Sequence, residues 1–339
     1  MSDGNSLQTV RAQSAHTPPD ISIAIRTVLQ TGRVFRMGIS FMSDLSGIWV
    51  AIVTPFHNDA THSVDHAALR RLVQHLRQAE VTGLVALGST GEAAALDDAE
   101  QDAVLDTVLD AAQGLPVIAG LAGNHVGHLH ARLAHLNTLP VHAVLSPAPY
   151  YVRPSQAALV HHFNDLADRS HAPLVLYDIP YRTGVAMDLH TILTLAAHPH
   201  ITGIKDCGGS LDKTQQLIAD GRLQVLAGED AQIFHNLCLG GAGAITAAAQ
   251  VCPQAFMAMF KALQSDQLTE ARQWQHRLSP LIRSLFSEPN PVVVKALLAH
   301  QGICQADLRL PHLPVTSQAS QRAAQALAEL TQGRHIISC

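Results

Sequence analysis

Residues 174–205 read LVLYDIPYRTGVAMDLHTILTLAAHPHITGIK, and this stretch decides the predicted fold. It contains two short apolar runs, 174–177 and 201–204, separated by a longer segment of mixed character. Short apolar runs of this kind favour strands that are buried on both faces. Strands buried in this way occur in parallel sheets, where each strand is followed by a helix that crosses back over the sheet.

The same pattern repeats along the chain. Apolar runs lie at residues 48–53, 83–87, 116–119, 142–145, 174–177, 201–204, 223–226 and 244–246. Helical patterns separate them: Leu69, Leu72 and Leu76 share one helical face, and Asp97 to Glu100 resemble a capping box before the next helix. Strands and helices that alternate eight times in about 200 residues favour a closed (β/α)8 TIM barrel, an α/β fold, over two open sheets.

The barrel is expected to occupy residues 44–264 of the 339-residue chain. Further helical patterns lie near 267–286, 291–300 and 318–330. They predict a C-terminal helical region over 265–332, followed by a tail at 333–339. Residues 1–43 are poor in acidic side chains and hold one interrupted apolar patch. We expect them to be an extension outside the fold, either disordered or the product of a misassigned start, with a transit peptide as the alternative.

Composition argues against several classes of function. With 47% apolar residues, 14% charged residues and a net charge of −5, the chain is predicted to be a soluble globular protein without a nucleic-acid partner. It has no uncharged apolar stretch of about 18 residues, so no membrane span is expected. Its five cysteines never show C-x-x-C spacing, which favours free thiols in a reducing cytoplasm. The histidines, including His125, His128 and His130, lack a cysteine or carboxylate frame, so no metal site is expected.

Lys205 is the sharpest chemical signal in the sequence. It is one of only four lysines, and it directly follows the buried run 201–204. Burial disfavours an ammonium ion, lowers its pKa and leaves more of the neutral amine that attacks a ketone carbonyl. The position therefore predicts a nucleophile that forms an imine. The alternative is a salt bridge between Lys205 and Asp206 or another nearby carboxylate.

Possible proton carriers follow two other strands. Tyr177 ends the run before that of Lys205, and Ser89 and Thr90 follow the run 83–87. A phenol beside the amine can move protons during imine formation, and the hydroxyl and N–H groups of the Ser-Thr loop can hold a substrate carboxylate. Each residue alone also fits a structural role. The active sites of (β/α)8 barrels lie at the C-terminal ends of the strands. The occurrence of all these residues at strand ends is therefore a more specific signal of an active site than any one of them.

Seven motifs carry a resemblance to a known family. They are AIVTPF at 51–56, GSTGE at 88–92, PYY at 149–151, YDIPYRTG at 177–184, GIK at 203–205, EPNP at 288–291 and LRLP at 308–311. Through them the chain resembles the dihydrodipicolinate synthase/N-acetylneuraminate lyase family of pyruvate-dependent Schiff-base aldolases. The resemblance implies a lyase in which Lys205 forms the imine with pyruvate, without a metal or an organic cofactor.

The resemblance also implies roles for the proton carriers. The tyrosine that matches Tyr177 handles protons, and the hydroxyls that match Ser89 and Thr90 bind the pyruvate carboxylate and relay protons. The tyrosine that matches Tyr151 belongs to a neighbouring subunit and takes part in the same proton relay. We therefore expect at least a dimer, and by resemblance a homotetramer built as a dimer of dimers.

The second substrate is less firmly indicated. Arg182 matches the arginine that binds the carboxylate of aspartate semialdehyde, and Gly228 and Ile245 complete the expected substrate-binding set. The expected reaction is therefore the condensation of pyruvate with L-aspartate 4-semialdehyde, the first step of diaminopimelate and lysine biosynthesis. One alternative is a related pyruvate aldolase that acts on a 2-keto-3-deoxy sugar acid or a hydroxy-oxo acid. An alternative of another class is a non-catalytic ligand-binding barrel.

Three positions depart from the pattern of the synthases in this family. Ser89 stands where threonine is usual, Asp178 where asparagine is usual, and Tyr181 where a small residue is usual. Tyr181 is expected to narrow or reshape the pocket, which keeps the alternative aldolase open.

Regulation by L-lysine is a further implication of the resemblance. Asn124 and Tyr150 match two polar contacts of the lysine site found in bacterial members. His128 stands where lysine-sensitive members have a glutamate, and Asp98 and Gln101 stand where they have histidines. A lost charge-assisted partner weakens binding, so we expect weakened inhibition by lysine.

Overall fold

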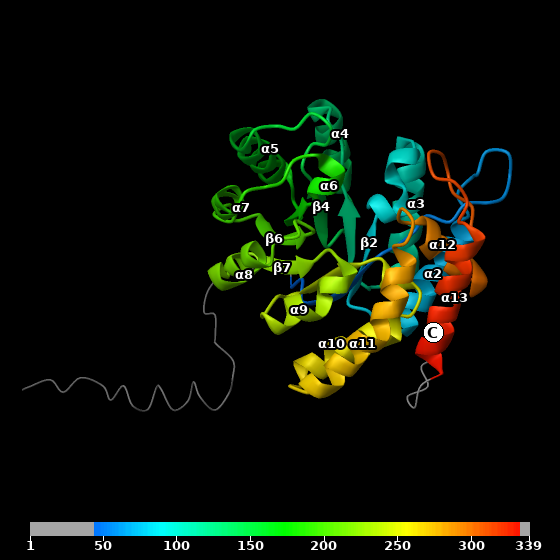
Figure 1. The fold of residues 1–339 in the computed structure, drawn as a ribbon. Helices are drawn as coiled ribbons and strands as arrows, with labels where there is room; N and C mark the ends of the chain where they lie inside the picture. Colours follow the sequence, from blue (N-terminus) through cyan, green and yellow to red (C-terminus); the bar gives the residue numbers. More distant parts are fainter. Residues whose placement is uncertain (1–43, 333–339) are drawn as a thin grey trace, which may run out of the picture. The chain divides into compact units, whose positions relative to one another are not determined.

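The protein forms one closed barrel of eight parallel strands in a computed structural model that describes residues 44–332 (Figure 1). The strands are β1 (Gly47–Ala51), β2 (Gly83–Ala86), β3 (Val117–Gly120), β4 (Ala143–Pro147), β5 (Leu174–Asp178), β6 (Ile201–Asp206), β7 (Gln224–Ala227) and β8 (Gly243–Thr246). Strand β1 pairs with both β2 and β8, which closes the barrel. The predicted (β/α)8 TIM barrel is confirmed. The predictions for 1–43 and 333–339 lie outside the described residues.

Helices alternate with the strands. They are α2 (His66–Gln78), α3 (Asp98–Ala112), α4 (Val126–Leu136), α5 (Gln156–Arg169), α6 (Pro180–Thr183), α7 (Leu189–Leu195), α8 (Leu211–Asp220), α9 (Ile233–Cys238) and α10 (Pro253–Gln264). The C-terminal part adds α11 (Leu268–Leu285), α12 (Val292–His300) and α13 (Ser317–Thr331). Helix α11 packs against α10 and α13, so the helical tail expected from the sequence covers one side of the barrel (Figure 1).

Strand alternation separates two apolar layers. In β5, Val175 and Tyr177 belong to the cluster inside the barrel, whereas Leu174 and Leu176 belong to the layer between strands and helices. The inner cluster also contains Trp49, Val85, Ile118, Leu145, Leu226 and Ile245. Because successive side chains of a strand point to opposite faces, this register turns Tyr177 towards the inside of the barrel.

Local signals explain the helices on either side of β2. The Asp97 carboxylate accepts the backbone N–H of Glu100 at 2.8 Å, and the Glu100 carboxylate accepts the N–H of Asp97 at 3.2 Å, so the predicted capping box is confirmed. Leu69, Leu72 and Leu76 form the buried face of α2, as their spacing predicts. Helix α2 precedes β2 and α3 follows it, so the loop that contains Ser89 and Thr90 runs from the end of β2 towards the start of α3.

One prediction about the cysteines is wrong. Cys207, Cys238 and Cys304 are free, as expected, but Cys252 is disulfide-bonded. Cys339 lies outside the described residues. No helix within residues 44–332 combines the length and the apolar character needed to cross a membrane.

Candidate active site

A cavity of about 450 Å³ lies where the C-terminal ends of the strands meet. It is lined by Ser89, Thr90, Tyr177, Tyr181, Arg182, Lys205, Gly228, Glu229, Asp230, Ile245, Ala247 and residues 286–290. The cavity thus brings together seven of the eight residues predicted for catalysis or substrate binding. The eighth, Tyr151, does not line it.

Lys205 and Tyr177 form the centre of this cavity. They are partners in the register of β5 and β6, and the Lys205 Nζ atom lies 4.5 Å from the centre of the Tyr177 ring. Both residues are buried, with exposed fractions of 7% and 6%. Burial lowers the pKa of the Lys205 amine, although the nearby Cys207, Asp230 and Glu229 oppose this shift. Part of the amine is therefore available in its neutral, nucleophilic form.

The salt-bridge alternative for Lys205 is wrong within the described residues, since no carboxylate lies within 4.0 Å of its amine. Asp206 instead accepts hydrogen bonds from the Gly208 N–H at 2.8 Å and from the Thr214 hydroxyl at 2.5 Å. A buried ammonium without a close counter-charge is costly, and losing its proton removes that cost.

The remaining lysines each pair with a carboxylate. Lys261 is exposed and lies 3.1 Å from a Glu80 oxygen, as expected for a surface lysine. Lys295 is fully buried and lies 2.5 Å from Glu92. Lys213 is largely buried: only 13% of its side chain is exposed, and it is paired with a buried carboxylate.

The phenol of Tyr177 has a hydroxyl partner. Burial raises the pKa of Tyr177, and a hydrogen bond with the Ser89 side chain opposes this rise. Tyr177 is therefore a neutral phenol in contact with a second hydroxyl, which is the arrangement a proton carrier needs.

Ser89 and Thr90 lie in the loop after β2, and residues from distant parts of the chain hold this loop in place. The Thr90 hydroxyl accepts a hydrogen bond from the Asn290 side-chain amide at 2.9 Å, and the Thr54 hydroxyl donates to the Gly91 carbonyl at 2.7 Å. Glu92 ends the loop in the left-handed conformation, with a φ of 52°, and its carboxylate is the one that pairs with buried Lys295.

Arg182 and Tyr181 approach the cavity from α6. An Nη atom of Arg182 lies 3.5 Å from the Asn290 carbonyl oxygen. The Tyr181 hydroxyl donates to a Glu229 oxygen at 2.9 Å, which links the segment after β5 to the segment after β7. Tyr181 therefore lies at the cavity wall, and its bond to Glu229 limits the open space there.

The sequence did not single out three polar residues of the cavity. Asp230 is buried; its carboxylate accepts hydrogen bonds from the Thr246 hydroxyl and, at 2.8 Å, from the Ala248 N–H. Burial raises the pKa of Asp230. Glu229 and Asn290 are the other two. Gly228-Glu229-Asp230 follows β7 directly, so its position after a strand was an available signal. Asn290 belongs to the EPNP motif at 288–291, which carried the resemblance but was not assigned to the site.

Tyr151 lies on the surface. Its side chain is 89% exposed, its φ is 70°, and its backbone N–H donates to the Thr183 carbonyl at 3.1 Å. A non-glycine residue with positive φ is uncommon, so the fold holds this exposed tyrosine in a defined backbone conformation. Nothing in a single chain brings its hydroxyl to the cavity.

A second cavity of about 470 Å³ adjoins the first and shares Ser89, Tyr177 and Arg182 with it. Its polar lining includes Asp98, Gln101, Asn124, His128 and Tyr150. The His128 Nε2 atom lies 3.0 Å from both carboxylate oxygens of Asp98, and the Asn124 amide donates to the Tyr150 carbonyl at 3.0 Å.

The histidines singled out in the sequence have ordinary partners. His125 caps α4 by accepting the His128 N–H at 3.0 Å, and His130 lies 2.5 Å from an Asp165 oxygen. Residues 44–332 contain no group of three or more His, Cys, Asp or Glu side chains arranged to hold a metal ion.

Comparison with known proteins gives matches over nearly all of the described chain. A sequence model described as the dihydrodipicolinate synthetase family matches residues 44–330. A relative from Methanothrix thermoacetophila, named 4-hydroxy-tetrahydrodipicolinate synthase, is 34% identical over 288 residues, covering 84% of this chain and 97% of the relative.

Solved structures are similar over the same extent. A chloride-inhibited dihydrodipicolinate synthase from Acinetobacter baumannii, complexed with pyruvate, has a TM-score of 0.81 and 31% identity, covering 84% of this chain and 98% of that one. A monomeric dihydrodipicolinate synthase variant has a TM-score of 0.82 and 29% identity, covering 86% and 99%. The segment matched by the family model, residues 44–330, includes every residue that lines the cavity.

Proposed function

The chain belongs to the dihydrodipicolinate synthetase family, and we propose that it condenses pyruvate with L-aspartate 4-semialdehyde, the reaction of a 4-hydroxy-tetrahydrodipicolinate synthase. The observation that carries the proposal is the buried Lys205 amine, which faces the cavity beside the Tyr177 phenol without a paired carboxylate among the described residues. The pyruvate held by a similar synthase supports the choice of donor. This reaction is the first step of diaminopimelate and lysine biosynthesis.

Imine formation begins at Lys205. The neutral amine attacks the ketone carbon of pyruvate, and the resulting carbinolamine loses water to give the imine. The lowered pKa of Lys205 supports this role, because an ammonium ion has no lone pair with which to attack. Tyr177 carries protons to and from the reacting atoms, and the Ser89 hydroxyl continues the path.

The pyruvate carboxylate is bound by the hydroxyls of Ser89 and Thr90. The bond from Asn290 supports this assignment, since it fixes the orientation of the Thr90 hydroxyl. Gly228 and Ile245 form the wall beside the imine. A side chain at position 228 would crowd this wall, because a Cβ there would lie 3.0 Å from the Lys205 Cγ atom and 2.3 Å from the Cys207 sulfur.

Arg182 binds the second substrate. Loss of a proton from the methyl carbon of the imine gives an enamine, and that carbon adds to the aldehyde carbon of the semialdehyde. The guanidinium of Arg182 suits the substrate carboxylate because it donates two parallel hydrogen bonds. The substrate amine then attacks the imine carbon, which closes the ring and frees Lys205. Bond formation and release balance with the loss of one water molecule, and no cofactor takes part.

Tyr151 completes the proton path from a neighbouring subunit in this proposal, within a homotetramer built as a dimer of dimers. Its 89% exposed side chain supports a role across an interface, since the cavity of its own chain does not include it. A monomeric variant exists among the similar synthases, so assembly varies within this fold. A cytoplasmic location stays a prediction from the sequence.

Turnover with a panel of acceptors tests the proposal. Pyruvate is supplied as donor, and kcat/KM is measured with L-aspartate 4-semialdehyde; cleavage of a six-carbon 2-keto-3-deoxy sugar acid is measured alongside. We expect the semialdehyde to be preferred by at least about a hundredfold, the discrimination that a buried charge-assisted contact provides. Preferred cleavage of the sugar acid would favour the related aldolase. Failure of both, together with no covalent adduct, would favour a binding barrel.

A further inference from the structure

Two aspartates directly follow the two central residues of the site. Asp178 follows Tyr177 and Asp206 follows Lys205, and the two aspartates are partners in the register of β5 and β6. Because strand side chains alternate between faces, a turn inwards by Tyr177 directs Asp178 outwards, into the layer between the barrel and its helices. Asp178 is completely buried there.

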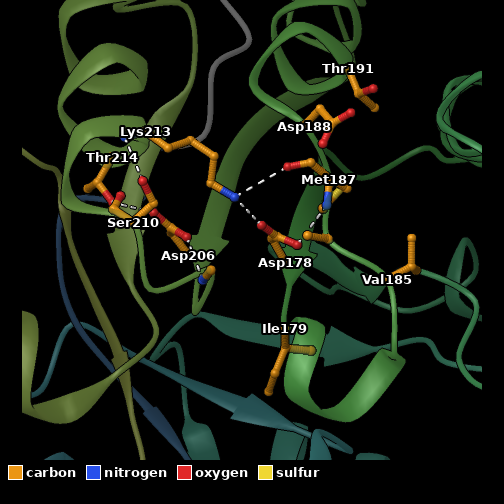
Figure 2. Close-up of polar contacts among 12 residues, drawn as sticks. Asp178, Ile179, Val185, Met187, Asp188, Thr191, Asp206, Ser210, Lys213 and Thr214 are labelled. Atoms are coloured by element: carbon orange, nitrogen blue, oxygen red, sulfur yellow. Dashed lines mark hydrogen bonds and ion pairs between the residues drawn. The ribbon is translucent and has the colours of Figure 1, made fainter.

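Lys213 of α8 provides the counter-charge for Asp178. The Lys213 Nζ atom lies 2.5 Å from the Asp178 Oδ2 atom (Figure 2). Burial raises the pKa of Asp178, and the Lys213 charge opposes that rise. Gly208 leaves room for the pair, since a Cβ at this position would lie 2.6 Å from the Lys213 Nζ atom and 2.8 Å from the Asp178 Oδ2 atom.

The same pair closes a loop of the backbone. The Asp178 Oδ1 atom accepts the N–H of Met187, nine residues further along, at 3.1 Å, and the Lys213 Nζ atom donates to the Met187 carbonyl at 3.3 Å. Figure 2 shows both side chains pointing towards the backbone of Met187. Asp178 and Met187 are thus held together at the base of one loop.

This loop carries the residues that meet the second substrate. Between its two fixed ends lies α6, with Tyr181 and Arg182 at the cavity wall. Outside its base, Tyr181 bonds to Glu229 at 2.9 Å and Arg182 to the Asn290 carbonyl at 3.5 Å. The loop backbone is also held at the Thr183 carbonyl by the Tyr151 N–H at 3.1 Å and at the Ala186 carbonyl by the Gln156 amide at 2.9 Å. The closed base is therefore one of the contacts that set the position of the Arg182 guanidinium.

From these contacts we infer that Lys213 and Asp178 are positioning residues for Arg182, and hence for the carboxylate-bearing acceptor. The inference rests on the proposed function, in which Arg182 binds that carboxylate. Under this inference, the contacts that position the acceptor differ from those that position the imine-forming amine. The acceptor side depends on the Lys213–Asp178 pair, whereas Lys205 is carried by β6, whose end is fixed by Asp206. A loosened loop base should weaken acceptor binding and leave the imine-forming amine in place.

The experiment compares acceptor use with imine formation in the full-length protein. Lys213→Met is expected to lower kcat/KM for L-aspartate 4-semialdehyde by about ten- to a hundredfold, mainly through KM, because small misplacements of a positioning group have effects of this size. Its rate of borohydride trapping with pyruvate should stay within about twofold of the unchanged protein. Lys213→Arg keeps the charge and should recover most of the loss.

A double variant tests whether Lys213 acts through Arg182. In an Arg182→Ala background, Lys213→Met should add less than about a twofold further loss, since effects that share one route are not additive. The matched control is Lys261→Met, which removes a lysine from an exposed ion pair far from the loop and should change neither measurement.

The outcomes are distinct. Equal damage by Lys213→Met to trapping and to acceptor use, or a full additional loss in the Arg182→Ala background, would overturn the positioning role. If Arg182→Ala lowers kcat/KM for L-aspartate 4-semialdehyde but Lys213→Met does not, the positioning role is also overturned. The proposed function would then still stand. Normal acceptor kinetics of Arg182→Ala itself would overturn the assigned acceptor site, and the positioning role with it.

Discussion

The Lys205 amine lies 4.5 Å from the centre of the Tyr177 ring, and the two residues are direct partners across β5 and β6. This relationship follows from strand register alone, since both are inward-facing positions at the C-terminal ends of neighbouring strands. The proposed nucleophile and its proposed proton carrier are thereby held side by side on neighbouring strands of the barrel.

Replacement of Tyr177 by phenylalanine removes the hydroxyl that we propose as the proton carrier and keeps the ring. We expect Tyr177→Phe to slow imine formation with pyruvate by about a hundred- to ten-thousandfold, the usual contribution of a positioned acid or base. The rate of borohydride trapping in single-turnover experiments measures this step. An unchanged rate would mean that the phenol is only a packing residue.

The pH dependence of imine formation should report the lowered pKa of Lys205. The rate is expected to fall at low pH, where the ammonium dominates, and to level off below the ordinary lysine pKa of about 10.4. Glu229 raises the pKa of Lys205, so Glu229→Gln should move the acidic limb to lower pH. Rates of borohydride trapping measured across pH test both statements. An acidic limb of the rate profile centred at the ordinary lysine pKa would contradict the first, and an unchanged limb in Glu229→Gln would contradict the second.

The buried Glu92–Lys295 pair should matter for stability. Lys295→Met leaves a carboxylate buried without its counter-charge, and we expect a loss of about 3–5 kcal/mol in the free energy of unfolding. Lys261→Met, at an exposed pair, should cost about 1 kcal/mol or less. Equilibrium unfolding in urea measures both values. Similar losses for the two variants would show that burial of the pair is unimportant.

Inhibition by L-lysine should be weak. Asp98 is the one acidic side chain among the described residues of the second cavity, and its carboxylate is already paired with His128. We therefore expect half-inhibition above about 1 mM L-lysine, corresponding to roughly 4 kcal/mol of binding. Initial rates at saturating substrates provide the test. His128→Glu frees Asp98 and adds a carboxylate, so it should strengthen inhibition; potent inhibition of the unchanged protein would refute this account of positions 98 and 128.

The features predicted correctly from sequence are local ones. Tyr177 and Lys205 lie at the C-terminal ends of short apolar runs, and barrel geometry then fixes which strand ends converge. The capping box of Asp97 and Glu100 lies within four residues and is equally readable. Observed strand bounds differ from the predicted ones by one or two residues, as for β4, predicted at 142–145 and observed at Ala143–Pro147.

The features that sequence could not supply depend on pairing between distant segments. The sequence around Lys213 does not indicate that its side chain pairs with a fully buried carboxylate. The sequence around Asn290 does not indicate that its side chain donates to the Thr90 hydroxyl. The long side chain of Lys213 extends from α8 to Asp178, a contact between segments 35 residues apart. The disulfide of Cys252 was missed for the same reason: spacing along the chain carries no information on it.

The central claim is that Lys205 is the nucleophile, and mass spectrometry after borohydride reduction with pyruvate tests it most directly. The account predicts one pyruvate-derived adduct per chain, located on Lys205 and absent from Lys205→Ala. Each other lysine is already held by a carboxylate and should remain unlabelled. An adduct on Lys213, Lys261 or Lys295, or full labelling of the Lys205→Ala variant, would contradict the account.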